Sequence, residues 1–264
     1  MPYITLTADF GLQSSAAAAI RGKIFSALPG MTVTDLCTTV EPFNLQQAVY
    51  LFRQAYRYFP AGSFHYVFND LHADPKQQLL YAQKDRQHIF CPDNGFMTML
   101  FDDRPVELFL LNEPLPAYNF LHVADTYISQ TTALISGLPP AMQPAHIQQL
   151  TVRHAAVPGG DLNSIEAQVI HIDTFGNVVL NVKQDHFEDI RQGRKFRILF
   201  TRDEELRSIS KHYSDVPEGQ KLCLFNTAGH LEIAVNKGNA ATLFGFLTRK
   251  EKHLFYNNIK IYFE

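Results

Sequence analysis

Short segments rich in Asp, Asn, His and Phe recur along the chain, and each is expected at the end of a strand. They read TADFG at 7–11, NDLHADP at 69–75, PDNG at 92–95, LHVAD at 121–125, IDTFGN at 172–177 and GHLEIAVNKGNAA at 229–241. A carboxylate can accept hydrogen bonds from hydroxyls or pair with an ammonium group, a side-chain amide donates and accepts, and a ring can cover a planar base. These residue types suit the binding of a small polar molecule.

The common nucleotide and hydrolase motifs are absent from the sequence. It contains no G-x-G-x-x-G, no P-loop, no G-x-S-x-G and no H-E-x-x-H. Cys37, Cys91 and Cys223 are odd in number, far apart and outside any C-x-x-C spacing. We therefore predict no metal site and no disulfide framework.

Composition narrows the class of partner. The 23 basic and 26 acidic residues are mixed along the chain and give a net charge of -3, so we expect no nucleic acid and no anionic membrane as partner. The first ten residues do not form a signal peptide, and no segment approaches the roughly 20 apolar residues of a membrane span. We expect a cytoplasmic protein that acts on a small molecule.

Alternating strands and helices are predicted for the first half of the chain. Strands are expected at 3–7, 63–69, 79–83, 88–91 and 106–111, and helices at 14–28 and 45–59. This pattern predicts an α/β domain. Because ligands of open α/β sheets bind beyond the carboxyl ends of the strands, Asp9, Asp70 and Asp93 are expected to converge on one rim of the sheet.

The second half has a different pattern. Residues 137–160 hold four prolines and lack a clear periodicity, so we place the connection between two domains there. Beyond it, short β runs at 167–172, 178–182, 196–200, 221–225 and 231–235 predict a small β-barrel or sandwich. We predict an α/β N-terminal domain at 1–155 with a central, mostly parallel sheet, and a smaller C-terminal β-barrel domain at 156–264.

The succession of these segments, from TADFG to LEIA, resembles the S-adenosylmethionine hydroxide adenosyltransferase and fluorinase/chlorinase family along nearly the whole chain. Each motif is short, but their order, with PDNG before LHVAD and then IDTFGN, is specific. The resemblance implies an α/β domain followed by a β-barrel, and a homotrimer with sites at subunit interfaces. It also implies S-adenosylmethionine as the substrate, with no further cofactor.

The resemblance implies a set of substrate-binding residues. Asp9 would take the ribose hydroxyls, although an Asp at this point can also simply close a turn. Asp173 would meet the methionine amine, Phe175 would stack on adenine and Asn177 would bind its edge, unless D-T-F-G-N is a plain hairpin turn. The remaining predicted substrate-binding positions are Asn94, Val235, Lys237, Thr227, where the family commonly has Ser, and Ser14, where relatives tend to have Asp near the amino-acid end of the substrate.

Catalysis in the hydroxide enzymes of this family uses an Asp, an Arg and a His to position and activate water. Asp70 and His122 match the first and the third, but Gln77 stands at the Arg position. Gln can orient water by hydrogen bonds, yet it cannot supply the fixed positive charge of a guanidinium. Neither Arg86 nor Lys76 can be assumed to replace that charge.

Two further departures affect the pocket and the nucleophile. Where relatives read VDPGVG this chain reads NDLHADP, and His72 in that loop is either a new catalytic group or a solvated side chain. Fluorinases place a Ser after the residue that matches His122, whereas this chain has Val123, which favours water over halide. His122 can also be a buried packing histidine.

Three hypotheses follow. In the first, the protein hydrolyses S-adenosylmethionine to adenosine and L-methionine, and Asp70 and His122 activate the water. In the second, the protein binds the nucleoside but catalyses little or nothing, because Gln77 replaces the Arg. In the third, the protein is purely a structural oligomer. The first two differ in whether any cation reaches Asp70, which the sequence does not reveal.

Overall fold

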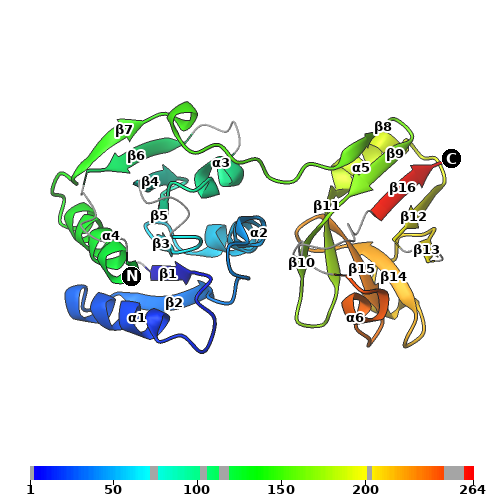
Figure 1. Cartoon of the computed structure of the whole chain (residues 1–264), viewed down its shortest axis with the longest axis horizontal. Helices are drawn as coiled ribbons and strands as arrows, with labels where there is room; N and C mark the ends of the chain where they lie inside the picture. Colours follow the sequence, from blue (N-terminus) through cyan, green and yellow to red (C-terminus); the bar gives the residue numbers. More distant parts are fainter. Residues whose placement is uncertain (1–2, 72–76, 102–105, 113–118, 201–203, 247–258) are drawn as a thin grey trace. The chain divides into compact units, whose positions relative to one another are not determined.

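The computed structural model describes residues 3–71, 77–101, 106–112, 119–200, 204–246 and 259–264 of the 264-residue chain (Figure 1). The backbone divides into two compact units, Met1–Ala155 and Ala156–Glu264. These are the N-terminal unit and the C-terminal unit.

The N-terminal unit is built on a seven-stranded sheet with the order β2-β1-β3-β5-β4-β6-β7. The strands are β1 (Tyr3–Thr7), β2 (Thr32–Cys37), β3 (Phe64–Val67), β4 (Leu79–Lys84), β5 (Gln87–Pro92), β6 (Glu107–Leu111) and β7 (Met142–Ala145). Strands β2, β1, β3 and β5 pair in parallel, while β4 and β7 run against their neighbours. The sheet is thus mixed, with most strands in one direction, and this α/β fold agrees with the prediction.

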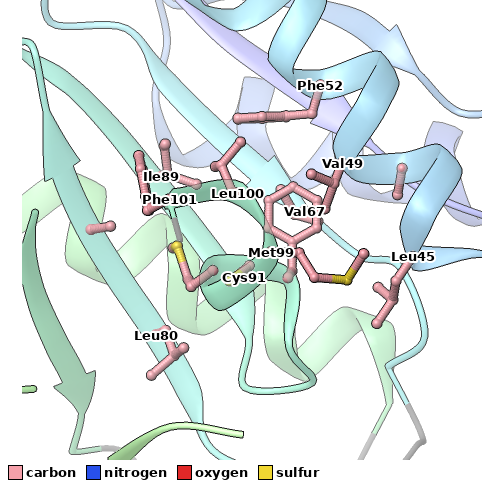
Figure 2. Close-up of a cluster of buried hydrophobic side chains, with 14 of the residues drawn as sticks. Leu45, Val49, Phe52, Val67, Leu80, Ile89, Cys91, Met99, Leu100 and Phe101 are labelled. Atoms are coloured by element: carbon pink, nitrogen blue, oxygen red, sulfur yellow. The ribbon is translucent and has the colours of Figure 1, made fainter. Parts of the chain in front are cut away.

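Helices cover both faces of this sheet. They are α1 (Ala16–Ala27), α2 (Leu45–Ala55), α3 (Phe96–Phe101) and α4 (Phe120–Ile135). Along β3 and β5 successive side chains alternate between the faces: Tyr66 and Phe90 join the core beneath α1 and α4, whereas Val67 and Ile89 join the core beneath α2 and α3. Figure 2 shows the second of these cores, where Phe52 of α2 packs near the sheet.

The ends of the helices follow local sequence signals. The Asn44 side chain accepts a hydrogen bond from Gln47 N at 3.0 Å and so begins α2. The helix predicted over 45–59 is shorter in the structure, because the chain tightens into a 3-10 turn, η1 (Tyr56–Tyr58), before Pro60. Among the described residues no helix is both long and apolar enough to span a bilayer.

The described residues of the C-terminal unit form two antiparallel sheets and two short α-helices. One sheet has the order β10 (Val169–Ile172), β11 (Val178–Lys183), β15 (His230–Val235) and β14 (Lys221–Phe225). The other has the order β13 (Glu205–Leu206), β12 (Phe196–Leu199), β16 (Ile259–Phe263), β9 (Ser164–Ala167) and β8 (Gly159–Asp161). The helices are α5 (Gln184–Arg191) and α6 (Ala240–Phe244).

The predicted β-barrel is not confirmed, because the described strands form two separate sheets and neither closes on itself. The strand expected at 167–172 is in fact two strands, β9 and β10, which belong to different sheets. Between them, Gln168 N donates to Asn181 Oδ1 at 2.8 Å and Gln168 O accepts from Asn181 N at 3.0 Å. The chain therefore changes sheet at Gln168, and the two sheets share one apolar core.

Candidate functional site

Asp9 and Asp70 lie next to each other beyond the carboxyl ends of the paired parallel strands β1 and β3. The backbone N–H of Asp70 donates to Asp9 Oδ2 at 3.1 Å, and that of Phe43 donates to the same oxygen at 3.1 Å. Asp70 has a φ of 50°, in the left-handed region that a non-glycine residue adopts only when its surroundings hold it there. The Asp9 carboxylate thus joins the loop after β3 to the segment before α2 at this rim.

Asn94, which is predicted to bind substrate, lies just after β5 and holds the loop after β3 that contains Asp70. Its Nδ2 donates to the backbone oxygens of Asn69 at 2.7 Å and Asp70 at 3.4 Å. Its Oδ1 accepts from Phe96 N at 3.1 Å, at the start of α3. Because the side chain is buried and both of its polar atoms are engaged within the protein, it supports the loop.

Asp93, the third acid expected on this rim, accepts its hydrogen bond from a different segment of the chain. Its Oδ1 accepts a hydrogen bond from Thr151 N at 2.9 Å. Burial raises the pKa of Asp93 above the usual value of an aspartate, while the hydrogen bonds from Thr151 oppose that rise. Asp93 therefore ties the segment around residue 151 to the end of β5.

His122 lies in the first turn of α4. The LHVAD segment is helical and does not follow a strand, which corrects the expectation from its sequence. Asn119 is the cap, since its Oδ1 accepts from Leu121 N at 2.9 Å and His122 N at 3.0 Å. The His122 side chain is partly exposed, so it is not a buried packing histidine.

Aromatic contacts place this end of α4 at the same edge of the sheet as the two carboxylates. The ring centroid of Phe120 lies 5.6 Å from that of Phe10, which lies 5.8 Å from that of Phe68. Phe10 directly follows Asp9, and Phe68 immediately follows β3. The amino end of α4 and the loops after β1 and β3 therefore meet through one aromatic cluster.

Ser14 stands at the start of α1, which follows the loop after β1. Its Oγ accepts from Ala16 N at 3.1 Å, and its backbone N–H donates to Gly11 O at 3.4 Å. The Ser14 hydroxyl thus takes part in starting the helix.

Gln77 is buried just before β4. The neighbouring Gln78 O accepts from Asp93 N at 2.8 Å, which holds this end of β4 beside the end of β5. Arg86 lies in the turn between β4 and β5, at the opposite end of β5 from Asp93. His72 and Lys76 lie outside the described residues.

Arg153, which sequence reasoning missed, reaches Asp70. Its Nη2 lies 4.0 Å from Asp70 Oδ2, and the Arg153 side chain is 48% exposed against 10% for Asp70. Arg153 belongs to the segment that the sequence indicated only as a connection between domains. No motif or periodicity in 137–160 would have singled it out.

In the C-terminal unit, Asp173, Phe175 and Asn177 form the turn between β10 and β11. Asp173 Oδ1 accepts from Phe175 N at 2.9 Å and Asn177 N at 2.8 Å, and its Oδ2 accepts from Asn177 Nδ2 at 2.9 Å. The Phe175 side chain is 76% exposed within this single chain. The turn is thus closed by its own Asp and presents an aromatic ring.

Val235 and Lys237 lie beside this turn. Val235 ends β15, and its carbonyl accepts from Gly238 N at 3.0 Å. Lys237 is exposed and forms an ion pair with Glu218. The backbone N–H of Ala241 donates to Gly176 O at 2.9 Å, which joins the start of α6 to the turn.

Thr227 does not lie at the end of the sheet that carries Phe175 and Val235. It is exposed in the turn between β14 and β15, at the other end of β15 from Val235. At about 3.3 Å per residue, the length of β15 separates the two positions by roughly 20 Å. Within the C-terminal unit, Thr227 is therefore distant from Phe175.

Comparison with known proteins identifies the family. The models of the SAM hydroxide adenosyltransferase N-terminal and C-terminal domains match residues 4–143 and 167–251. A protein of Thermus thermophilus named (R)-S-adenosyl-L-methionine hydrolase is 27% identical, over 90% of this chain and 93% of its own length. A Methanocaldococcus jannaschii protein of the same name is 21% identical, over 91% and 90%.

A solved structure agrees with the fold. An uncharacterized conserved protein from Thermotoga maritima superposes with a TM-score of 0.80 at 23% identity, and the match covers 100% of both chains. Since the two family models together match well over half of the chain, the chain belongs to the SAM hydroxide adenosyltransferase family.

Proposed function

We propose that this protein hydrolyses S-adenosylmethionine to adenosine and L-methionine. The observation that carries the proposal is the contact between Asp9 and the backbone of Asp70, which sets a candidate ribose ligand beside a candidate water-orienting carboxylate. The name (R)-S-adenosyl-L-methionine hydrolase, given to relatives that match about nine-tenths of this chain, supports the same reaction.

Asp9 would hold the ribose. An ionised carboxylate offers about four acceptor positions, and the amides of Phe43 and Asp70 use Oδ2. The rest of the carboxylate can accept hydrogen bonds from the 2′ and 3′ hydroxyls. A ribose held in this way places its 5′ carbon within reach of groups on the loop after β3.

The reaction is a displacement at that carbon. A new bond forms between the water oxygen and C5′ while the C5′–S bond breaks, and the electron pair of that bond neutralises the sulfonium to give the thioether of methionine. The proton lost by the water passes to Asp70 or His122 and then to solvent. Because the sulfonium is already a good leaving group, the protein need only orient the water and accept the proton, with Gln77 as an orienting amide.

The adenine would be bound by residues of the C-terminal unit. The exposed Phe175 ring is available for stacking, and Asn177 follows it in the same turn. Asp173 would pair with the methionine amine through the carboxylate that closes this turn. A homotrimer with sites at subunit interfaces is part of the proposal, and sedimentation analysis of the purified protein tests it.

Water is the proposed nucleophile, and halide is not. Val123, at the position where fluorinases have Ser, is fully buried in the core beneath α1 and α4 and has no hydroxyl to offer. Halide must shed its water of hydration before it attacks, and it would lack that donor here.

The test is to incubate purified protein with each sulfonium epimer of S-adenosylmethionine and to quantify adenosine and methionine chromatographically. Equal release of both products, abolished in Asp70→Asn and His122→Ala, supports the proposal. Binding without release, detected by calorimetry and removed in Asp9→Ala, would instead favour a nucleoside-binding protein. The absence of both binding and release would favour a structural oligomer. The cytoplasmic location remains a prediction.

A further inference from the structure

We propose that Arg153 is the cation that positions Asp70 for catalysis and so replaces the Arg that this chain lacks at Gln77. The inference rests on the proposed function, since it concerns the same reaction. It starts from the 4.0 Å separation between Arg153 Nη2 and Asp70 Oδ2. That separation exceeds a direct hydrogen bond, so the pair interacts through charge.

The backbone of Arg153 is fixed to the N-terminal unit by α3. The buried Thr98 Oγ1 accepts from Arg153 N at 3.0 Å and lies 3.1 Å from Arg153 O, to which it can donate. Two residues earlier, Thr151 N donates to Asp93 Oδ1 at 2.9 Å. The segment is therefore anchored both to α3 and to the end of β5, which are elements of the N-terminal unit.

Gly95 fixes the course of the Arg153 side chain. A Cβ atom on Gly95 would lie 2.5 Å from Arg153 Cγ, 2.6 Å from Cβ and 2.8 Å from Cδ. Gly95 also has a φ of 98°, which residues with a side chain rarely adopt. Position 95 therefore requires glycine for two reasons, the positive φ and the close contact with Arg153. The missing side chain leaves the space in which the aliphatic part of Arg153 runs toward Asp70.

The surroundings of Asp70 explain why a cation matters. Its loop is held by Asp9 through the backbone amide and by Asn94 through the backbone carbonyl. The Asp70 side chain is only 10% exposed, and burial away from water disfavours the charged form of a carboxylate. The guanidinium of Arg153 offsets that cost and favours an ionised Asp70, the form that accepts a hydrogen bond from the attacking water.

The experiment compares Arg153→Ala and Arg153→Lys with the wild type and with Arg57→Ala. Arg57 is exposed in η1, at the amino end of β3, so its removal subtracts the same charge far from Asp70. We expect Arg153→Ala to lower kcat about tenfold with little change in KM, and to move the acidic limb of the pH profile up by about one unit. Arg153→Lys should recover part of the loss because it restores the charge.

A second measurement does not depend on turnover. Carbon-13 NMR of labelled aspartate follows the titration of Asp70, whose signal is assigned by its loss in Asp70→Asn. We expect the midpoint to move to higher pH in Arg153→Ala and to stay in place in Arg57→Ala. This shift would support the pairing of Arg153 with Asp70 even if the wild type released no adenosine. The lack of adenosine would then refute the proposed function and leave the pairing standing.

Two results would overturn the inference. One is a titration midpoint of Asp70 that Arg153→Ala leaves unchanged, with wild-type kcat and pH profile. The other is an Arg153→Lys variant as impaired as Arg153→Ala, because the charge would then not be what matters.

Discussion

Substitutions of Asp9 should change the stability of the fold and the affinity for S-adenosylmethionine to different extents. Asp9→Ala removes the acceptor of two backbone N–H groups, those of Phe43 and Asp70. The Asp70 amide lies in a nearly buried residue, and losing a hydrogen bond to a charged group costs about 1.5–3 kcal/mol there. Phe43 is exposed, so water can replace the lost acceptor and the cost is nearer 0.5 kcal/mol.

The two terms add to about 2–3.5 kcal/mol. For a protein of this size each kcal/mol lowers Tm by about 2–4 °C, so Asp9→Ala should lower Tm by roughly 4–14 °C. Asp9→Asn keeps a side-chain oxygen for the same amides, so its Tm should fall by less than half as much. Both variants should raise the Kd for S-adenosylmethionine, because a neutral amide accepts hydrogen bonds from ribose hydroxyls less strongly than a carboxylate does.

The assay is thermal unfolding by circular dichroism with calorimetric binding on the same samples. An Asp9→Ala variant with the Tm of the wild type would refute the structural role of the carboxylate. An Asp9→Asn variant with the Kd of the wild type would refute its role as a ribose ligand.

Three further predictions concern other parts of the chain. Burial lowers the pKa of His65 from 6.5 to about 4, so the folded state keeps this side chain neutral while the unfolded state takes up a proton. The free energy of unfolding should therefore fall by about 3 kcal/mol as the pH drops from 6.5 to 4. Denaturant unfolding at several pH values checks this, and the fall should be smaller in His65→Gln. Gly95→Ala should lower both Tm and kcat because the new methyl group meets Arg153, whereas Gly62→Ala, with a similar φ but open space, should lower only Tm. Phe175→Leu should raise KM about tenfold through lost stacking and leave Tm unchanged, as steady-state kinetics and thermal unfolding would reveal.

Strand ends were the part of the site that the sequence predicted well. Asp9 and Asp70 each follow a short apolar run, and the parallel pairing of β1 with β3 brings such positions together. The partners of the third acid were not foreseeable, because Asp93 turns to Thr151, which comes from a distant segment. The same segment supplies Arg153, whose path depends on the space above Gly95 and on no pattern of its own.

The helix that carries His122 was missed for a different reason. Residues 120–135 include several Thr, Ser and Tyr, whose helix propensity is modest, and the packing of Val123 and Tyr127 against the sheet outweighs it. A local signal was available in Asn119, which is a strong helix cap. In the C-terminal unit, regular β runs could not distinguish one closed sheet from two, since that depends on the break at Gln168.

The position of β16 in its sheet affects how the C-terminal unit folds as the chain is synthesised. It lies between β12 and β9, so it completes the middle of its sheet with residues that a ribosome adds long after both neighbours. Until β16 arrives, each neighbour has an open edge and part of the shared core lacks Ile259, Ile261 and Phe263. Such pairing between distant segments is slow, and open edges favour association with other chains. A nascent chain stalled before β16 should therefore depend on chaperones that shield apolar surface.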